Sequence, residues 1–428
     1  ERMLSLKNIA QSKLVRNSAK LISANAIAQA IGLLVYPILS RLYTPEDFGL
    51  LNLFLGIGGL LVLLSTAEYQ YAILLPKEER KSKGAFQVCV LLLVSTTCLV
   101  LLTLPFKENI ASYFKAEHLA DYYFLLPLFV LLGGMWNALN MYYTRRKRFN
   151  AVSEYQLSQS ILSSGTKIAL FYTPLQMGGL LYATVIAALV ACATSVLRHL
   201  KGQLKDLLMF DWSAIKTALT EYRKFPLFSL PRAFANNLSN TLPTLLLTPF
   251  FGLSLVGYFS MAVTLAFRPI AMICNSIHQV LFQRVVEQVN LQQPIIGLFK
   301  RYSLYTILFV LPTFSVLFAF MPTLVTWLLG ADWEMTATCI RWMLPWLCIT
   351  CLSSPICFVA DVFMQQKTGF VFEILIVLMR LIGLMIGVLT HSFINAIIGY
   401  CLMSTAILFV QWLWFIWLVL RYERKRLR

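Results

Sequence analysis

The sequence predicts an all-α integral membrane protein with about twelve transmembrane helices in two pseudo-symmetric six-helix lobes. Three observations support this fold class: the composition, the spacing of the apolar runs, and the distribution of basic residues between them. Of the 428 residues, 58% are hydrophobic and 13% are charged, and the mean hydropathy is +0.71. Soluble domains carry about a quarter charged residues. The composition therefore excludes a water-soluble enzyme, a secreted disulfide scaffold and a disordered chain.

The apolar runs are long enough to cross a bilayer, which takes about 20 residues of helix for a hydrocarbon core of ~30 Å. One run, 150–172, is diluted by serine and glutamine, and we keep it because the charge distribution requires an even number of spans. The twelve predicted spans are Ser18–Leu42, Phe48–Leu75, Gly84–Phe106, Tyr122–Tyr143, Asn150–Tyr172, Met177–Leu197, Pro226–Thr248, Leu255–Gln283, Ser303–Met321, Thr336–Met364, Gly369–Thr390 and Phe393–Leu420.

The basic residues orient these spans, because cytoplasmic loops of membrane proteins are enriched in lysine and arginine. With the N-terminus inside, 28 of the 36 basic residues fall in cytoplasmic segments. The opposite side has three, namely Arg41, Lys107 and Lys115. We therefore expect a multi-pass protein of the bacterial inner membrane with both termini in the cytoplasm. The net charge of +17 is explained by this asymmetry, and we expect no nucleic-acid partner.

A weak internal repeat supports two halves of six spans each. Leu39 and Gly49, around the loop after span one, match Leu247 and Gly257 around the loop after span seven, at a shift of 208 residues. Parallel repeats of this kind are common in transporters. The predicted domains are an N-terminal lobe (1–200), a cytoplasmic connector (201–224) that forms an amphipathic interfacial helix, and a C-terminal lobe (225–428).

Two motifs resemble a known family. The stretch LSRLYTPEDFGLL at 39–51, preceded by the NSAK sequence that starts at Asn17, and the basic loop YYTRRKRF at 142–149 resemble Wzx-type polysaccharide flippases, which handle O-antigen or capsule repeat units. These belong to the multidrug/oligosaccharidyl-lipid/polysaccharide exporter superfamily. The resemblance implies two lobes around a central, partly hydrophilic cavity lined by spans one, two, seven and eight. It also implies alternating access that moves an undecaprenyl-pyrophosphate-linked oligosaccharide from the inner to the outer leaflet.

Apart from Lys20 and Arg41 near the two ends of span one, five basic residues lie inside predicted spans, where each costs about 2.5–3.5 kcal/mol on insertion scales. They are Lys167, Arg232, Arg268, Arg341 and Arg380. On span seven, Arg232 recurs at four-residue spacing with Asn236 and Asn240; on span eight, Arg268 does so with Ser260 and Thr264. Residues at this spacing share one helix face. Such polar stripes face either neighbouring helices, as interhelical hydrogen bonds, or a hydrated cavity.

For the two arginines we favour the cavity, because a guanidinium stays charged and binds two phosphate oxygens at once. The predicted substrate-binding residues are the arginines for the pyrophosphate, the amides for the glycan, and two lysines without an assigned part of the cargo. They are Arg232 and Arg268; Asn236, Asn240, Asn25 and Gln29; and Lys20 and Lys167. Expected partners are the lipid-linked glycan, membrane lipids and the polysaccharide polymerase machinery.

Glu68 is the one acidic group that we place within span two. It either binds a coupling proton or sodium ion, or neutralises a cavity arginine, and we favour the second role. Beyond such an ion we expect no cofactor, no metal and no catalytic residue. A Walker-type phosphate loop is absent from the sequence, so the chain carries no ATPase of its own.

Three other functions compete with this interpretation. A multidrug or cation antiporter of the same fold would need an acidic, aromatic cavity, whereas the deepest stripe charges are arginines. A membrane scaffold or a polymerase-like enzyme belongs to a different class, and a polymerase would need a large outside loop; the longest here is 107–121. A lipid II flippase is a close relative of the favoured function and stays open.

Overall fold

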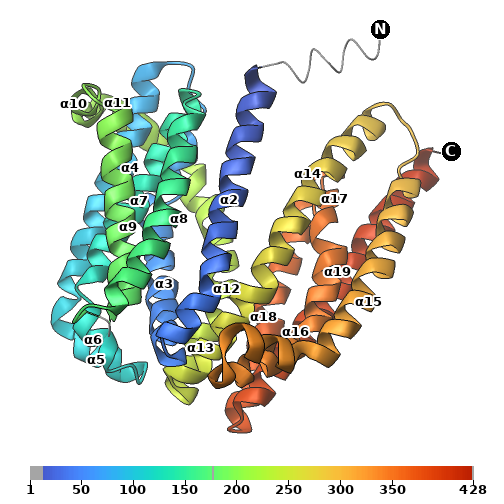
Figure 1. The fold of residues 1–428 in the computed structure, drawn as a ribbon. Coiled ribbons are helices and arrows are strands. Elements are labelled where there is room, and N and C mark those ends of the chain that lie inside the picture. The colour runs from blue at the N-terminus through green and yellow to red at the C-terminus, as the bar shows by residue number, and fades with distance from the viewer. Residues whose placement is uncertain (1–12, 176–177, 427–428) are drawn as a thin grey trace. The chain divides into compact units, whose positions relative to one another are not determined.

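The computed structural model describes residues 13–175 and 178–426, and within these residues the regular elements are helices (Figure 1). Packing divides the chain into two compact units, Glu1–Asn237 (unit 1) and Leu238–Arg428 (unit 2). The division falls inside helix α12, whereas the predicted lobes divide at the connector. The two units are described separately below.

Unit 1 contains the long helices that follow the first six predicted spans, short helices at their ends, and the connector. The elements are α2 (Lys13–Leu42), α3 (Pro45–Thr66), η1 (Tyr69–Ile73), α4 (Glu79–Leu102), η2 (Leu104–Phe106), α5 (Lys107–Tyr113), α6 (His118–Tyr122), α7 (Leu125–Arg145), α8 (Phe149–Phe171), α9 (Gly179–His199), α10 (Leu204–Leu208), α11 (Trp212–Glu221) and η4 (Phe225–Ser229).

Unit 2 holds most of α12 and the helices that follow it. The elements are α12 (Leu230–Phe251), α13 (Leu253–Ala262), η5 (Val263–Phe267), α14 (Arg268–Asn290), α15 (Ile296–Leu329), η6 (Ala331–Trp333), α16 (Glu334–Ser353), η7 (Ser354–Ile356), α17 (Val359–Val362), α18 (Gln366–Leu389) and α19 (Phe393–Arg426). The elements η4 and η5 are π-helical, whereas η1, η2, η6 and η7 are 3₁₀ helices.

The described helices follow the predicted spans in order, and ten of them are long and apolar enough to cross a membrane. The chain is thus an all-α, multi-pass membrane protein. The two predicted spans that fall short of this hydropathy lie in α8 and α12, both of spanning length but rich in polar residues. Two polar groups of α8 have partners within unit 1: Ser160 Oγ donates to the Ala28 carbonyl at 2.6 Å, and Glu154 contacts His199 at 2.9 Å.

The Pro-Glu-Asp-Phe-Gly motif forms the start of α3. Thr44 caps the helix, Pro45 occupies its first turn, and the Asp47 side chain accepts from the Thr44 backbone while Thr44 accepts from the Asp47 backbone. This capping box satisfies two backbone donors that a helix start otherwise leaves unpaired. The motif therefore has a structural reason that is independent of any substrate.

The internal repeat occupies equivalent places in the two units. Leu39 and Leu247 are both buried near the end of a long helix. Gly49 and Gly257 are both buried at the fifth position of the next helix, α3 or α13. The sequence match thus coincides with a match in local structure.

The connector packs on the N-terminal part of α4. Gly84 lies against α11 so closely that a Cβ there would be 2.6 Å from the Ala214 carbonyl oxygen. Arg80 and Asp211 form an ion pair at 2.7 Å, and the Asp211 side chain also caps α11. The Arg80 guanidinium and two backbone amides hold the pKa of Asp211 at about 2. Lys81 and Glu221 add a second ion pair at 3.1 Å.

In unit 2, α18 and α19 approach each other through glycines. A Cβ on Gly383 would collide with the Gly399 carbonyl oxygen, and one on Gly387 would collide with the Ala396 side chain. Small residues at such crossings allow membrane helices to pack closely. This contact holds the helix that carries Arg380 firmly in the unit.

Candidate functional site

Arg232 and Asn236 lie on the first turns of α12, directly after the π-helical turn η4, and both side chains are exposed. Asn240, four residues further and in unit 2, is also exposed. The polar stripe predicted on span seven is thus present as one exposed helix face. Asn236 and Asn240 make further polar interactions, and the described residues give Arg232 no ion pair. Because the Arg232 side chain is exposed, an anionic group of a ligand can reach it.

Glu68 does not lie inside a membrane span, contrary to the sequence prediction. The helix α3 ends at Thr66, and Glu68 adopts a left-handed backbone conformation (φ 65°) before the 3₁₀ turn η1. Its side chain is buried and accepts from Gln70 Nε2 at 3.4 Å. Burial raises the pKa of Glu68, while the Gln70 hydrogen bond and the positive charge of Arg232 lower it. Glu68 and Arg232 therefore interact electrostatically within unit 1.

The two amides predicted to bind substrate from span one lie on α2. Asn25 and Gln29 are both exposed, and Gln29 Nε2 donates to Asn25 Oδ1 at 3.2 Å. Lys20 lies on the same helix, but its side chain is outside the described part of the chain. Lys167 lies half-buried on α8, and its backbone carbonyl accepts from the Tyr43 hydroxyl at 2.7 Å.

The stripe predicted on span eight is wrong in its first two members. Ser260 and Thr264 are buried, whereas Arg268 is exposed. The cause is η5, a π-helical turn that ends at Phe267. A π turn bonds residues five apart and advances the register, so positions four apart no longer share a face across it. Arg268 instead begins a new polar face on α14, which it shares with the exposed Asn275 and Gln279.

Arg380 is buried within unit 2, with 7% of its surface exposed. Its guanidinium donates to Ser239 Oγ at 2.8 Å and to Ser404 Oγ at 3.3 Å. It also lies over the rings of Trp346 and Tyr400, 5.6 and 5.4 Å from their centroids. These contacts join α12, α16 and α19 to α18. Arg380 is therefore a structural residue, whose partners are hydroxyls and aromatic rings.

Arg341 also has a structural role, because its guanidinium hydrogen-bonds to the main chain of α15. Its Nε donates to the Phe318 carbonyl at 2.9 Å, and its guanidinium lies 5.4 Å from the centre of the Phe318 ring. Pro322, four residues later on α15, has no backbone N–H to bond that carbonyl. Arg341 supplies the missing donor at the proline of α15.

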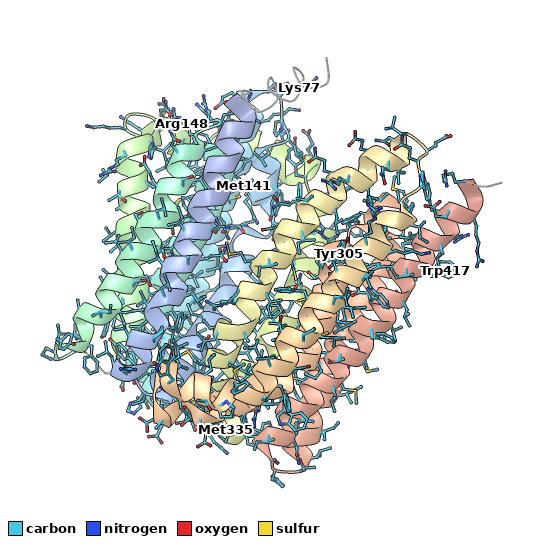
Figure 2. All side chains as sticks on the ribbon, turned by 45° about the vertical axis from the view of Figure 1, so that its right-hand side comes forward. Lys77, Met141, Arg148, Tyr305, Met335 and Trp417 are labelled. Atoms are coloured by element: carbon cyan, nitrogen blue, oxygen red, sulfur yellow. The ribbon has the colours of Figure 1, made fainter. Side chains whose placement is uncertain are left out.

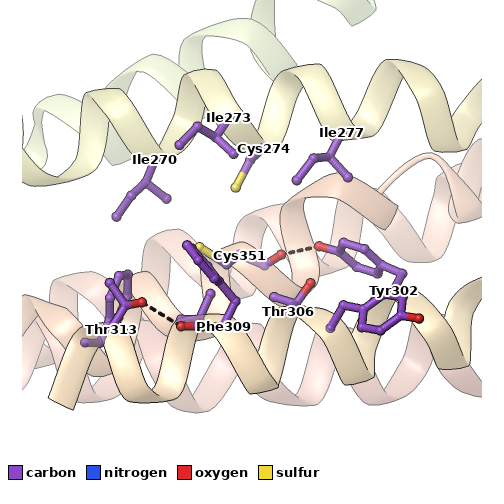
Figure 3. Close-up of a pocket in the computed structure, with 12 residues that line it drawn as sticks. Ile270, Ile273, Cys274, Ile277, Tyr302, Thr306, Phe309, Thr313 and Cys351 are labelled. Carbon is purple, nitrogen blue, oxygen red and sulfur yellow. Dashed lines mark hydrogen bonds between the residues drawn. The ribbon is translucent and has the colours of Figure 1, made fainter. Parts of the chain in front are cut away.

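Sequence reasoning missed an apolar groove between α14 and α15. Figure 3 shows Ile270, Ile273, Cys274 and Ile277 of α14 facing Phe309 and its neighbours of α15 across it. No periodicity of a single span reports it, because two helices have to diverge to form it. A short-range signal exists only on α14, where apolar residues three and four apart lie opposite the polar face.

Basic residues gather at one end of unit 1. Figure 2 shows Lys77 and Arg148 at the same end of this unit, which is the end that the charge distribution assigns to the cytoplasm.

Among the described residues, no group of three or more His, Cys, Asp or Glu side chains is placed to hold a metal ion. The exposed polar faces thus offer guanidinium groups and amides as ligands.

The family comparison decides the identity of the chain. A family model described as polysaccharide biosynthesis protein (Polysacc_synt_3) matches residues 38–338. The chain belongs to this family. Among functionally curated proteins, no sequence matches this polysaccharide biosynthesis protein at a significant level.

Solved structures place this polysaccharide biosynthesis protein in a known fold. An inward-facing multidrug resistance MATE family transporter of the MOP superfamily has a TM-score of 0.70 at 16% identity, over 92% of this chain and 96% of that chain. The lipid II flippase MurJ, in an inward closed conformation, has a TM-score of 0.71 at 13% identity, over 95% and 90%. A point mutant of the Vibrio cholerae MATE transporter VcmN reaches 0.60 at 15% identity, over 97% and 98%. These likenesses confirm the predicted fold class, and with the family match they confirm the resemblance to the exporter superfamily.

Proposed function

We propose that this protein is a flippase that moves an undecaprenyl-pyrophosphate-linked oligosaccharide from the inner to the outer leaflet of the bacterial inner membrane. Transport would proceed by alternating access, with both termini in the cytoplasm and no covalent bond made or broken. The family match supports a role in polysaccharide biosynthesis, and the transporter fold supports movement of a substrate across the membrane.

The observation that carries the proposal is the exposure of Arg232 and Arg268 on helices that belong to the transmembrane part of the chain. A guanidinium at bilayer depth without a packed partner is costly. The two residues differ in this respect from Arg380, which is surrounded by protein. A polyanionic cargo such as a pyrophosphate would supply a counter-charge to both guanidinium groups, and we assign Arg232 and Arg268 to it.

The remaining polar groups fit the other parts of such a cargo. The exposed amides Asn25, Gln29, Asn236 and Asn240 offer donors and acceptors for sugar hydroxyls. Glu68 acts on Arg232 and would serve as its counter-ion when the pyrophosphate is absent. Protonation of Glu68 would remove that counter-charge and leave Arg232 free to bind an anion. This gives Glu68 a role in coupling transport to a proton.

A lipid II flippase remains the second candidate, because MurJ shares the fold and its cargo belongs to the same chemical class. The proposal is tested by deleting the gene in its natural host and identifying which lipid-linked sugar accumulates on the inner leaflet. A repeat unit of an exported polysaccharide is expected. Accumulation of lipid II would favour the second candidate, and unchanged lipid-linked sugars would contradict both.

A further inference from the structure

The groove between α14 and α15 lies within unit 2 and has a volume of about 350 Å³ (Figure 3). Large apolar side chains on both helices border it without being covered by protein: Ile273 is 60% exposed and Phe309 is 73% exposed. Tyr305 of α15, labelled in Figure 2, also lines the groove and is 66% exposed. The groove is thus built from side chains that require an apolar ligand or lipid to shield them.

Two polar groups of the groove are already bonded to the protein backbone. Thr313 Oγ1 donates to the Phe309 carbonyl at 2.7 Å, and the Tyr302 hydroxyl donates to the Cys351 carbonyl. A polar ligand would gain few hydrogen bonds here, because the groove offers mainly the hydroxyls of Tyr305 and Thr306, and it would lose those it makes in water. The volume is at the lower end of ligand sites, about 300–1,000 Å³. The groove therefore holds a segment of an apolar chain.

The helix α14 separates this groove from the polar face described above. Ile270, Ile273 and Ile277 recur at three- and four-residue spacing, and at about 100° per residue Ile277 lies on the side opposite Arg268. Arg284 continues the groove face seven residues beyond Ile277, roughly 10 Å along the helix. It is exposed, and the described residues give it no ion pair. The apolar face of α14 that lines the groove thus leads to a cation about two turns further along the helix.

We infer that this groove binds the part of the polyprenyl chain next to the pyrophosphate of the lipid-linked cargo. The inference rests on the proposed function, which supplies a cargo with an apolar chain and an anionic head. The match is one of shape and charge: the apolar groove fits the chain, and Arg284 meets the phosphates when the cargo first binds, before they move to Arg232 and Arg268. A methyl-branched isoprenoid fills a groove of branched and ring side chains with more close contacts than a linear acyl chain does.

The test uses the full-length protein in lipid nanodiscs with two photoreactive probes at equal mole fraction. One is a polyprenyl pyrophosphate with a diazirine on the first isoprene units, and the other is a phospholipid with the same group on an acyl chain. After illumination, labelled peptides are identified by mass spectrometry. The polyprenyl probe is expected to label α14 and α15 at the groove. Added unlabelled polyprenyl pyrophosphate is expected to reduce this labelling. Equal labelling by the phospholipid, or polyprenyl labelling elsewhere, would overturn the inference.

A matched pair of variants sharpens the result. Ile273→Trp fills the groove and is expected to reduce labelling by on the order of tenfold, or about 1.4 kcal/mol of binding. Leu308→Trp adds a similar bulk at a position of α15 that is 61% exposed but does not line the groove, and labelling should be unchanged. Equal labelling in both variants would contradict the inference. If Ile273→Trp does not fold, the inference is still tested on the natural chain, by whether unlabelled polyprenyl pyrophosphate reduces labelling of the groove by the probe.

Flipping of the glycan lipid is measured in parallel in proteoliposomes, which separates the two proposals. Flipping without labelling of the groove would overturn the groove inference alone. Labelling of the groove without flipping would contradict the proposed function while supporting polyprenyl binding.

Discussion

Arg380 and Arg268 lie on helices of the same unit, and their surroundings are opposite. Arg380 is enclosed by two aromatic rings and two serine hydroxyls, so protein groups take up its charge. Arg268 is exposed at the start of α14, directly after a π turn. The comparison shows that an arginine inside an apolar run is either a structural link or a group presented to something outside the unit. Only the surroundings distinguish the two.

Arg232 repeats the arrangement of Arg268 in the other unit. It follows the π turn η4 by three residues and is exposed, as Arg268 follows η5. Single π turns are frequent at functional sites because they change which side chains a helix presents. Two such turns, each just before an exposed arginine, connect local backbone geometry with the proposed site.

The largest expected effect comes from reversing an exposed charge. Arg268→Glu should abolish display of the glycan on the cell surface, because it repels the pyrophosphate, while expression stays at the natural level. Surface glycan is measured by antibody or lectin binding and expression by immunoblot. The control is Arg421→Glu, which reverses an exposed charge at the end of α19 and should leave display intact. Full display in Arg268→Glu would remove that residue from the mechanism.

The opposite outcome is expected at the buried arginine. Arg380→Leu should lower the free energy of unfolding by about 1.5–3 kcal/mol, the value of hydrogen bonds to a charged group. It leaves Ser239 and Ser404 without their donor. The loss is measured as thermal stability of the purified protein in detergent. A stable Arg380→Leu protein that has lost transport would place Arg380 among the substrate-binding residues instead.

An intermediate effect is expected from Arg232→Lys. Lysine keeps the charge but cannot bind two phosphate oxygens in a planar fork. Transport of the glycan lipid in proteoliposomes should fall by about tenfold, in line with the loss of roughly one charge-assisted hydrogen bond. Unchanged transport would show that positive charge alone suffices at this position.

Much of this architecture follows from the sequence. Apolar length predicts the positions of the long helices, since a chain in lipid has to satisfy its backbone within each helix. The stripe Arg232–Asn236–Asn240 is predicted because a continuous α-helix keeps four-residue spacing on one face. The stripe through Ser260 and Thr264 fails because a π turn, which depends on packing, interrupts the helix. The prediction for Glu68 is wrong for a related reason: the end of α3 at Thr66 depends on left-handed residues that hydropathy does not reveal.

A smaller change is expected at Glu68. Burial raises its pKa, so the protonated form persists to higher pH than for an ordinary glutamate, against the opposing effects of Gln70 and Arg232. If its protonation drives transport, Glu68→Gln, which mimics the protonated form, should make transport independent of pH. Proteoliposomes with an imposed pH gradient supply the measurement. Retained pH dependence would limit Glu68 to a counter-ion of Arg232.

The smallest effect is expected at the connector. Asp211→Asn keeps a helix cap but removes the ion pair with Arg80, so hydrogen exchange in α11 should become faster while transport is unaffected. The natural chain should show the same loosening only in acid. A lowered pKa contributes stability above the unfolded value, about 3.9, and this contribution is lost as the pH falls through about 2. Slow exchange in Asp211→Asn would mean that the ion pair is dispensable. The close contact at Gly84 and the hydrogen bonds of the Gln87 side chain with the backbone of Met209 and Asp211 would then hold the connector.

The most direct test of the account measures binding of undecaprenyl pyrophosphate to the purified protein by native mass spectrometry. The natural chain is compared with the double variant Arg232→Gln, Arg268→Gln and with Arg341→Gln, whose arginine bonds the backbone of α15. The account predicts that the double variant binds on the order of a hundredfold more weakly, or about 2.8 kcal/mol, while Arg341→Gln binds as the natural chain does. Equal affinity of all three proteins would contradict it.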